Sequence, residues 1–158
     1  MLLAEGTSIP DLSCEDQNGD LRSLKELIGE KGAVFYFYPK DNTPGCTTEA
    51  KDFQEMLQSF SDEGLTIIGI SKDSVKSHTN FCTKHELTFT LLSDKEGALC
   101  EAFGVWQEKK NYGRTYMGIV RSTFIVDHEG IIKKSYAKVR VKEHVAKVRD
   151  EAFSLLGE

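Results

Sequence analysis

The chain has 158 residues, of which 39% are hydrophobic and 28% charged, and no long linker or repeat divides it, so residues 1–158 are interpreted as one globular domain. Its formal net charge of −5, without a local cluster of Lys and Arg, argues against nucleic acid and anionic membranes as partners. No apolar run approaches the length of a membrane span and the N-terminus lacks the features of a signal peptide, so we expect a cytoplasmic protein.

The first half of the chain predicts a hairpin and a strand–helix–strand unit. Residues 12–14 and 21–22 flank the sequence Asn18-Gly19, which is typical of a tight hairpin turn. Residues 33–38 and 65–70 are apolar, β-branched or aromatic runs that predict two buried strands. Between these strands, one connecting helix and hence a parallel strand pair are predicted by apolar residues at helical spacing: Ala50, Phe53, Met56, Leu57 and Phe60.

The second half predicts shorter elements. Asp73 is the expected N-cap of a helix, followed by a strand at 90–92, a helix at 97–103 and a hairpin of residues 122–126 and 131–137. The helix after Asp73 has Val75, His78, Phe81 or Cys82, and His85 along one side, and the last helix has an apolar stripe of Val141, Val145, Val148, Ala152 and Leu155. This order predicts an α/β, thioredoxin-like fold with insertions, in which helices flank both faces of a central mixed β-sheet.

Cys46 is the main candidate for chemistry. The chain has four cysteines, too few and too widely spaced for a secreted disulfide scaffold, so a role in packing, metal binding or catalysis is expected of each. Residues 38–49 lie where the first long strand ends and a helix begins, and ligands bind at that edge of α/β sheets. Cys46 is therefore expected in the first helical turn, where unpaired N–H groups and the helix dipole stabilise a thiolate.

Two blocks of sequence resemble one known family. The pattern Pro39-x-x-x-Thr43-x-x-Cys46 resembles the active-site motif of the peroxiredoxins, and residues 38–50 are similar to the bacterioferritin-comigratory, or Q-type, subgroup. The same subgroup is resembled by residues 104–106, 108–110, 112–113, 117–119 and 121–127, so the similarity covers roughly residues 9–137. The resemblance implies a thiol peroxidase that reduces hydrogen peroxide and organic hydroperoxides without a metal or other cofactor. It further implies a monomer that thioredoxin or a similar dithiol re-reduces.

The resemblance also implies roles for matching residues. Cys46 is the peroxidatic cysteine, which becomes a sulfenic acid, while Thr43 binds the peroxide and the thiolate. Pro39 shapes the loop and shields the sulfur, Arg121 binds the thiolate and stabilises the transition state, and Glu49 orients that arginine.

Donors to the peroxide are expected to supply most of the catalysis. Thiolate formation alone gives only a few-fold advantage, because the nucleophilicity of a thiolate falls as it is stabilised. The candidate donors are the backbone N–H groups of Gly45 and Cys46, the Thr43 hydroxyl and one guanidinium. Thr43 also fits the N-cap position of the helix, which is compatible with a catalytic role.

Cys82 is the expected resolving cysteine. Many Q-type members carry that cysteine five residues after the peroxidatic one, where this chain has Lys51, and others carry it on the following helix, which Cys82 matches. A disulfide between Cys46 and Cys82 requires local unwinding, because cysteines on separate helices of a folded domain seldom start close enough to bond. The alternative is a packed, structural Cys82 beside Phe81, which makes the protein a one-cysteine peroxidase.

Other interpretations stay open beside this one. Cys14 and Cys100 are interpreted as structural, and the four histidines form no tight ligand cluster with the cysteines, so no metal site is expected. A cysteine hydrolase needs a histidine base paired with Cys46. A third class is a non-enzymatic holdase or partner-binding protein on the same scaffold.

Overall fold

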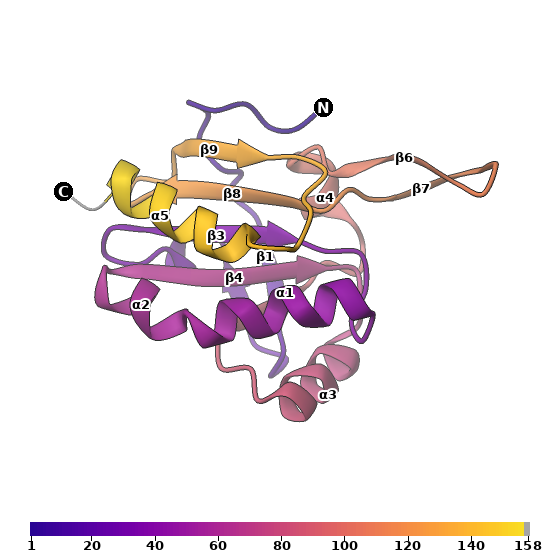
Figure 1. The fold of residues 1–158 in the computed structure, drawn as a ribbon, viewed down its shortest axis with the longest axis horizontal. Helices are drawn as coiled ribbons and strands as arrows, with labels where there is room; N and C mark the ends of the chain where they lie inside the picture. Colours follow the sequence, from indigo (N-terminus) through magenta and orange to yellow (C-terminus); the bar gives the residue numbers. More distant parts are fainter. Residues whose placement is uncertain (157–158) are drawn as a thin grey trace.

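A seven-stranded mixed sheet forms the centre of the protein, which a computed structural model describes for residues 1–156 (Figure 1). The strand order is β2-β1-β5-β4-β3-β8-β9, in which β3, β4 and β5 are parallel and the other neighbours antiparallel. The strands of this sheet are β1 (Ser13–Asp16), β2 (Leu21–Ser23), β3 (Gly32–Phe37), β4 (Leu65–Ser71), β5 (Thr90–Ser93), β8 (Ser122–Asp127) and β9 (Ile132–Tyr136). The predicted first hairpin, parallel pair and second hairpin are all confirmed.

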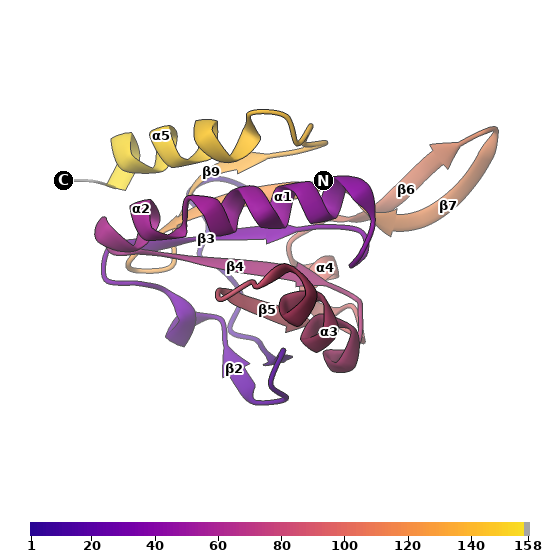
Figure 2. The same ribbon diagram turned by 60° about the horizontal axis from the view of Figure 1, so that its bottom comes forward.

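Helices cover both faces of the sheet, as predicted. One face packs against α1 (Pro44–Glu55), α2 (Leu57–Asp62), α3 (Val75–His85) and α5 (His144–Leu156), and the other against η1 (Lys25–Leu27), α4 (Ala98–Ala102) and the N-terminal segment. Figure 2 shows α5 beside α1, and α3 beside β5. No helix within residues 1–156 is long and apolar enough to cross a membrane.

The central strand β3 supplies side chains to both cores. All six of its residues are buried, because helices cover it on both sides and β4 and β8 pair with its two edges. Val34 and Tyr36 pack into the core under α1, α3 and α5, whereas Phe35 and Phe37 pack on the opposite side with α4. This burial fixes the end of β3, and the residues that follow it form the site described below.

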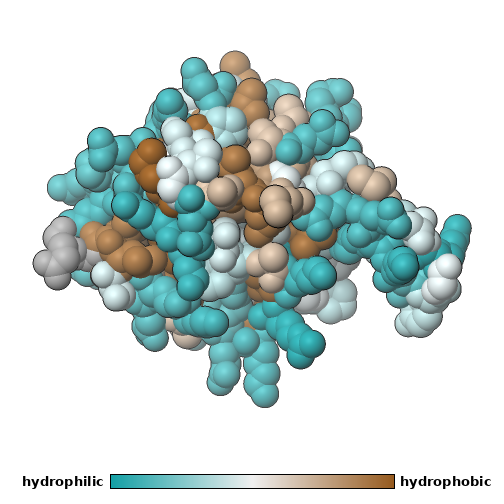
Figure 3. Space-filling view, turned by 90° about the horizontal axis from the view of Figure 1, so that it is seen from above, coloured by the Kyte–Doolittle hydropathy of each residue, from teal (hydrophilic) through white to brown (hydrophobic). Residues whose placement is uncertain are grey.

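A projecting hairpin was not predicted from the sequence. Strands β6 (Trp106–Asn111) and β7 (Arg114–Ile119) form a separate two-stranded sheet that extends away from the body of the molecule (Figure 1). Tyr112 and Gly113 have φ values of 53° and 76°, which suits a type I′ turn. The hairpin is mostly hydrophilic (Figure 3), so it lacks the alternation of apolar residues that predicts a half-buried strand.

The helix predicted to connect β3 and β4 is interrupted. It divides into α1 and α2 at Met56, whose backbone angles are φ −97° and ψ 4°. No Gly or Pro marks this position, so the sequence carries no local signal for the break.

Two further predictions about helices were wrong. Ser74, rather than Asp73, caps α3, and the Ser74 hydroxyl accepts a hydrogen bond from the backbone N–H of Ser77. The stripe of α5 was also misplaced at both ends, because Val141 lies in the loop before the helix, and Leu155 is 47% exposed while Leu156 is buried.

Candidate active site

Cys46 lies in the first turn of α1, as predicted. Thr43 is the N-cap with an extended backbone, and Pro44 is the first helical residue, where its missing N–H costs no hydrogen bond. The first helical bond of this end runs from the Thr47 N–H to the Thr43 carbonyl, so the N–H groups of Gly45 and Cys46 have no partner within the helix. Cys46 is only 1% exposed, so its sulfur lies in a largely desolvated environment.

Arg121 reaches Cys46 from a distant part of the chain. Arg121 directly precedes β8. Ser122, the first residue of β8, pairs with Phe37, the last residue of the antiparallel neighbour β3, so the start of β8 and the end of β3 lie side by side. The Arg121 Nη2 donates to Cys46 Sγ over 3.2 Å, and its Nη1 donates to Glu49 Oε1 over 2.6 Å. The guanidinium thus bridges the sulfur and a carboxylate.

Glu49 accepts a hydrogen bond from that guanidinium. It lies one turn after Cys46 on the same side of α1 and is fully buried. Burial raises the pKa of Glu49 to about 7, although the charge and hydrogen bond of Arg121 act in the opposite direction. Its Oε2 has no hydrogen-bond partner among residues 1–156. Burial alone would lower the pKa of Arg121, but the facing Glu49 and Cys46 raise it and keep the guanidinium charged.

Gly45 makes room for the arginine. A Cβ atom at this position would lie 3.2 Å from Arg121 Nη2 and 4.0 Å from Val141 Cγ2, so any side chain here would press on the guanidinium. The sequence predicted only the backbone N–H of Gly45 as functional. Its lack of a side chain also matters, because a Cβ here would make the Arg121 guanidinium shift by a few tenths of an ångström.

The loop before Cys46 borders an open cleft. The Thr43 hydroxyl donates to the Lys40 carbonyl over 2.8 Å, which braces the loop and leaves the hydroxyl oxygen as an acceptor. Pro39 lies in the wall of a surface cleft of about 490 Å³, which Gln107, Glu108, Lys109, Lys110, Val120, Arg121, Lys138 and Val139 also line. The catalytic roles of Pro39 and Thr43 stay predictions.

Cys82 lies on α3 in the same apolar core as Cys46. Both are free thiols, as the prediction for the reduced protein requires. Burial and the charge of Asp41 raise the pKa of Cys82 to about 11, so its thiol stays protonated in this arrangement. Burial and Asp94 raise the pKa of Cys14 to about 12 and that of Cys100 further, which suits the structural roles expected of both.

Two residues near the site, Lys109 and Val141, were not predicted from the sequence to lie there. Val141, from the loop before α5, contacts the space beside Gly45, and the Lys109 ammonium donates to the Ile119 carbonyl next to the arginine. Burial and the Arg121 charge lower the pKa of Lys109. No local sequence signal reveals these residues, because only the tertiary structure brings them to the sulfur.

Histidine side chains have other partners in this structure. Among the described residues, the hydrogen bond recorded for Cys46 comes from Arg121, whereas His78 bonds Asp41 and His144 bonds Thr123. A cysteine hydrolase mechanism therefore lacks the paired base that it needs.

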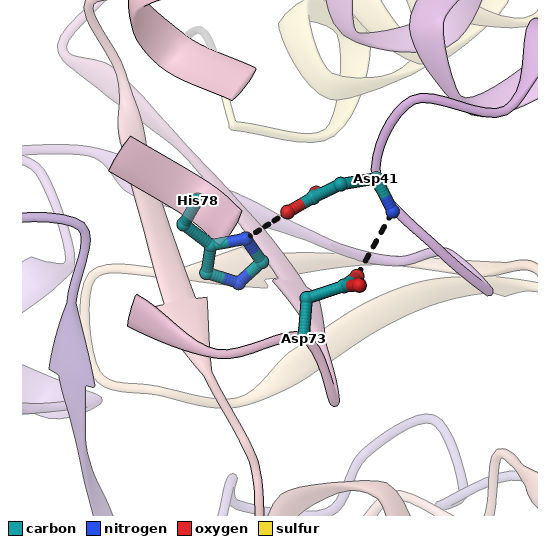
Figure 4. Close-up of side chains that lie close together, drawn as sticks. All are labelled: Asp41, Asp73 and His78. Carbon is teal, nitrogen blue, oxygen red and sulfur yellow. Dashed lines mark hydrogen bonds and ion pairs between the residues drawn. The ribbon is translucent and has the colours of Figure 1, made fainter. Parts of the chain in front are cut away.

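One cluster has the composition of a metal site. Ligand atoms of Asp41, Asp73 and His78 lie within 4.8 Å of one another (Figure 4). Hydrogen bonds already occupy these atoms, since Asp41 accepts from His78 and Ser77, and Asp73 accepts from Ser71 and the Asp41 N–H. A cation would have to displace these donors, so the cluster is better described as a hydrogen-bond network.

Comparison with known proteins gives consistent matches over most of the chain. A family model described as the AhpC/TSA family matches residues 6–135. The peroxiredoxin Bcp of Bacillus subtilis is 50% identical over 146 residues, which are 92% of each chain. A structure of the Xanthomonas campestris bacterioferritin comigratory protein, described by its alkyl peroxide reduction activity and trapped intermediate and ligand complexes, has a TM-score of 0.90 at 40% identity and covers 98% of this chain and 100% of its own.

Two further Xanthomonas campestris structures are of peroxiredoxin Q variants with a serine in place of a cysteine at position 48 or 84 of that protein. Their TM-scores are 0.90 and 0.89 at 40% and 41% identity. The matches cover 98% and 96% of this chain, and 99% and 98% of those chains. These likenesses confirm the predicted thioredoxin-like fold.

Proposed function

This chain belongs to the AhpC/TSA family and is a peroxiredoxin, a thiol peroxidase, and we propose that Cys46 is its peroxidatic cysteine and Cys82 its resolving cysteine. The observation that carries the first assignment is the 3.2 Å contact between Arg121 Nη2 and Cys46 Sγ at the N-terminus of a helix. A buried sulfur that faces a fixed cation and unpaired N–H groups is arranged to react as a thiolate.

The first step is attack of the Cys46 thiolate on the terminal oxygen of a hydroperoxide. A sulfur–oxygen bond forms, the O–O bond breaks, and the products are the Cys46 sulfenic acid and an alkoxide that takes up a proton as the alcohol. Negative charge moves from sulfur to the departing oxygen during this step. Arg121 and the N–H groups of Gly45 and Cys46 lie where they can follow that charge, which is the kind of stabilisation that matters most in a dry site.

Organic hydroperoxides are the proposed substrates beside hydrogen peroxide. The Xanthomonas campestris relative is described by its alkyl peroxide reduction activity. In this chain, an open cleft of about 490 Å³ is lined by Pro39 and by Arg121, whose guanidinium contacts the Cys46 sulfur, and this cleft is the proposed position of the alkyl group.

In the second step, the Cys82 thiol attacks the Cys46 sulfenic acid. A disulfide forms, and the hydroxyl group leaves as water with the thiol proton, so no other oxidant is required. The two cysteines substituted in the Xanthomonas campestris relative lie 36 residues apart, the same separation as Cys46 and Cys82. That match favours Cys82 over Cys14 and Cys100.

Thioredoxin or a similar dithiol is the proposed reductant of the disulfide, and we propose a monomer in the cytoplasm. The four free thiols suit a reducing compartment. Outside the β6–β7 hairpin, the large exposed apolar side chains among the described residues are those of Met1, Leu21 and Leu155. They belong to separate segments of the chain, which supports a monomer. Sedimentation equilibrium of the reduced protein tests this, and a dimer at micromolar concentration would contradict it.

Oxidation with one equivalent of hydrogen peroxide, followed by peptide mapping, tests the cysteine assignments. We expect one Cys46–Cys82 disulfide within each chain, no peroxide consumption by Cys46→Ser, and a stable sulfenic acid in Cys82→Ser. Cys14→Ser is the matched control and should behave as the wild type. A Cys46 sulfenic acid that persists in the wild type would instead identify a one-cysteine peroxidase.

A further inference from the structure

A buried hydrogen-bond network ties the loop that leads to Cys46 to the helix that carries Cys82, and Figure 4 shows its link between Asp41 and His78. Asp41, five residues before Cys46, has a side chain only 1% exposed. Its Oδ2 accepts from His78 Nδ1 over 2.7 Å and from the Ser77 hydroxyl over 2.8 Å, and both residues belong to α3. The Tyr38 hydroxyl donates to Asp41 Oδ1 over 2.6 Å. The network therefore connects the loop between β3 and α1 directly to α3.

Both ring nitrogens of His78 have hydrogen-bond partners. Its Nε2 lies 2.9 Å from the Leu92 carbonyl oxygen, which can only accept, so Nε2 must carry a proton. Its Nδ1 faces Asp41, whose two oxygens already accept from Tyr38 and Ser77. Burial would raise the pKa of Asp41, but His78, Tyr38 and Ser77 together lower it. The arrangement is thus a fully buried, hydrogen-bonded pair of an imidazole and a carboxylate, and opening it costs free energy because both groups are shielded from water.

The same pair fixes the turn of α3 that leads to Cys82. His78 is four residues, about one helical turn, before Cys82, so holding His78 in place holds the start of that turn. A disulfide requires Cα atoms within about 7 Å, and the two sulfurs are unbonded thiols on different helices. Burial and Asp41 also raise the pKa of Cys82 to about 11, which disfavours the nucleophilic thiolate.

We propose that Asp41 and His78 are positioning residues of the resolving step, and that their pair must open before Cys82 can reach the Cys46 sulfenic acid. This inference rests on the proposed role of Cys82. The strength of the pair then sets how long the sulfenic acid persists after peroxide attack. During that time a second hydroperoxide can transfer an oxygen to the sulfenate, which gives a sulfinic acid and an alcohol.

Variants of His78 separate this role from peroxide attack. His78→Ala removes the link to Asp41, whereas the amide of His78→Asn can still donate to Asp41 Oδ2 and so retains part of it. We expect disulfide formation to be at least about tenfold faster in His78→Ala, since one hydrogen bond to a charged group contributes that much, with His78→Asn intermediate. The rate of peroxide attack should stay within about threefold of the wild type, because His78 touches neither Cys46 nor Arg121.

Stopped-flow mixing of the reduced protein with hydrogen peroxide measures both rates, and mass spectrometry after excess peroxide measures the sulfinic acid. His78→Ala should form less sulfinic acid than the wild type at equal peroxide. Thr79→Val is the matched control, because it removes a different α3 hydrogen bond, that of the Thr79 hydroxyl to the Gln17 carbonyl. It should leave the ratio of the two rates unchanged. Equal acceleration by Thr79→Val would overturn the proposal in favour of general loosening of α3.

Asp41→Asn guards against a misfolded His78→Ala. Its amide can donate to His78 Nδ1 and accept from Tyr38, so these contacts persist without the carboxylate charge, and disulfide formation should again be faster. An unchanged or slower rate in both variants, with the Cys46–Cys82 disulfide still formed, would overturn this inference alone. A wild type that forms no such disulfide would overturn the proposed role of Cys82 as well.

Discussion

Replacement of Arg121 by methionine removes the cation and keeps a side chain of similar length. The wild-type guanidinium donates to Cys46 Sγ over 3.2 Å and to Glu49 Oε1 over 2.6 Å. Both acceptors are buried, so water cannot readily replace the lost donor at either one. The variant therefore removes the one side chain that, among the described residues, donates hydrogen bonds to both Cys46 and Glu49.

We expect a large loss because Arg121, in the proposed mechanism, stabilises both the thiolate and the departing oxygen. Removal of one preorganised donor to a developing negative charge typically costs about 10²–10³ in rate, or about 3–4 kcal/mol. We therefore expect kcat/KM for hydrogen peroxide to fall by about that factor. The loss of folding stability should be smaller, on the order of 1–3 kcal/mol, because Glu49, whose pKa burial raises to about 7, can take up a proton when its partner is removed.

Single-turnover consumption of hydrogen peroxide by the reduced protein measures the rate, and urea unfolding measures the stability. Arg149→Met is the matched control, since that arginine contacts Asp150 and Met56 away from the sulfur, and it should retain the wild-type rate. A rate for Arg121→Met within about fivefold of the wild type would refute the argument that this guanidinium stabilises the transition state.

Three further outcomes are expected. The pKa of Glu49 rises from 4.5 to about 7 through burial, so the folded state holds a proton that the unfolded chain releases, and this stabilising contribution is lost as the pH rises towards and through 7. Urea unfolding should show the wild type losing up to about 3 kcal/mol relative to Glu49→Gln between pH 4.5 and 7, and parallel curves would contradict it. Gly45→Ala should lower kcat/KM about tenfold with little change in stability, because its Cβ would lie 3.2 Å from Arg121 Nη2, and full activity in the peroxide assay would contradict this. Cys100→Ala should keep its peroxidase rate but lose about 1 kcal/mol in urea unfolding, because Cys100 is fully buried, and a slower peroxide reaction would show that it is more than a packing residue.

Local patterns were sufficient for the elements that build the core. Residues 33–38 and 65–70 predicted β3 and β4 because strands covered on both faces are continuously apolar. The position of Cys46 followed from the same pattern, since the loop after a buried strand leads into the next helix. For β3, α1 and β4, the local sequence pattern and the tertiary structure favour the same secondary structure, so these elements could be predicted from the sequence.

Elements held by tertiary contacts could not be predicted in this way. Asp73 has the residue type of an N-cap, yet its carboxylate accepts from the Asp41 N–H and the Ser71 hydroxyl, and Ser74 takes the cap. The β6–β7 hairpin has few buried residues, so no apolar alternation marked it. For Asp73 the deciding partner includes Asp41, which is distant in the sequence. For the hairpin it is the solvent that surrounds most of its side chains.

The position of Arg121 shows most clearly what a linear sequence leaves open. It lies 75 residues after Cys46, and its own surroundings describe only a residue before a strand. The family resemblance, and no physical pattern, selected it. Once β8 is known to pair antiparallel with β3, however, its placement is forced, because Ser122 lies opposite Phe37 and the start of one strand meets the end of the other. Had β8 paired at another edge of the sheet, the same arginine would be a surface residue. The strand order therefore decides whether the proposed active site can form, because this order brings the Arg121 guanidinium to the Cys46 sulfur.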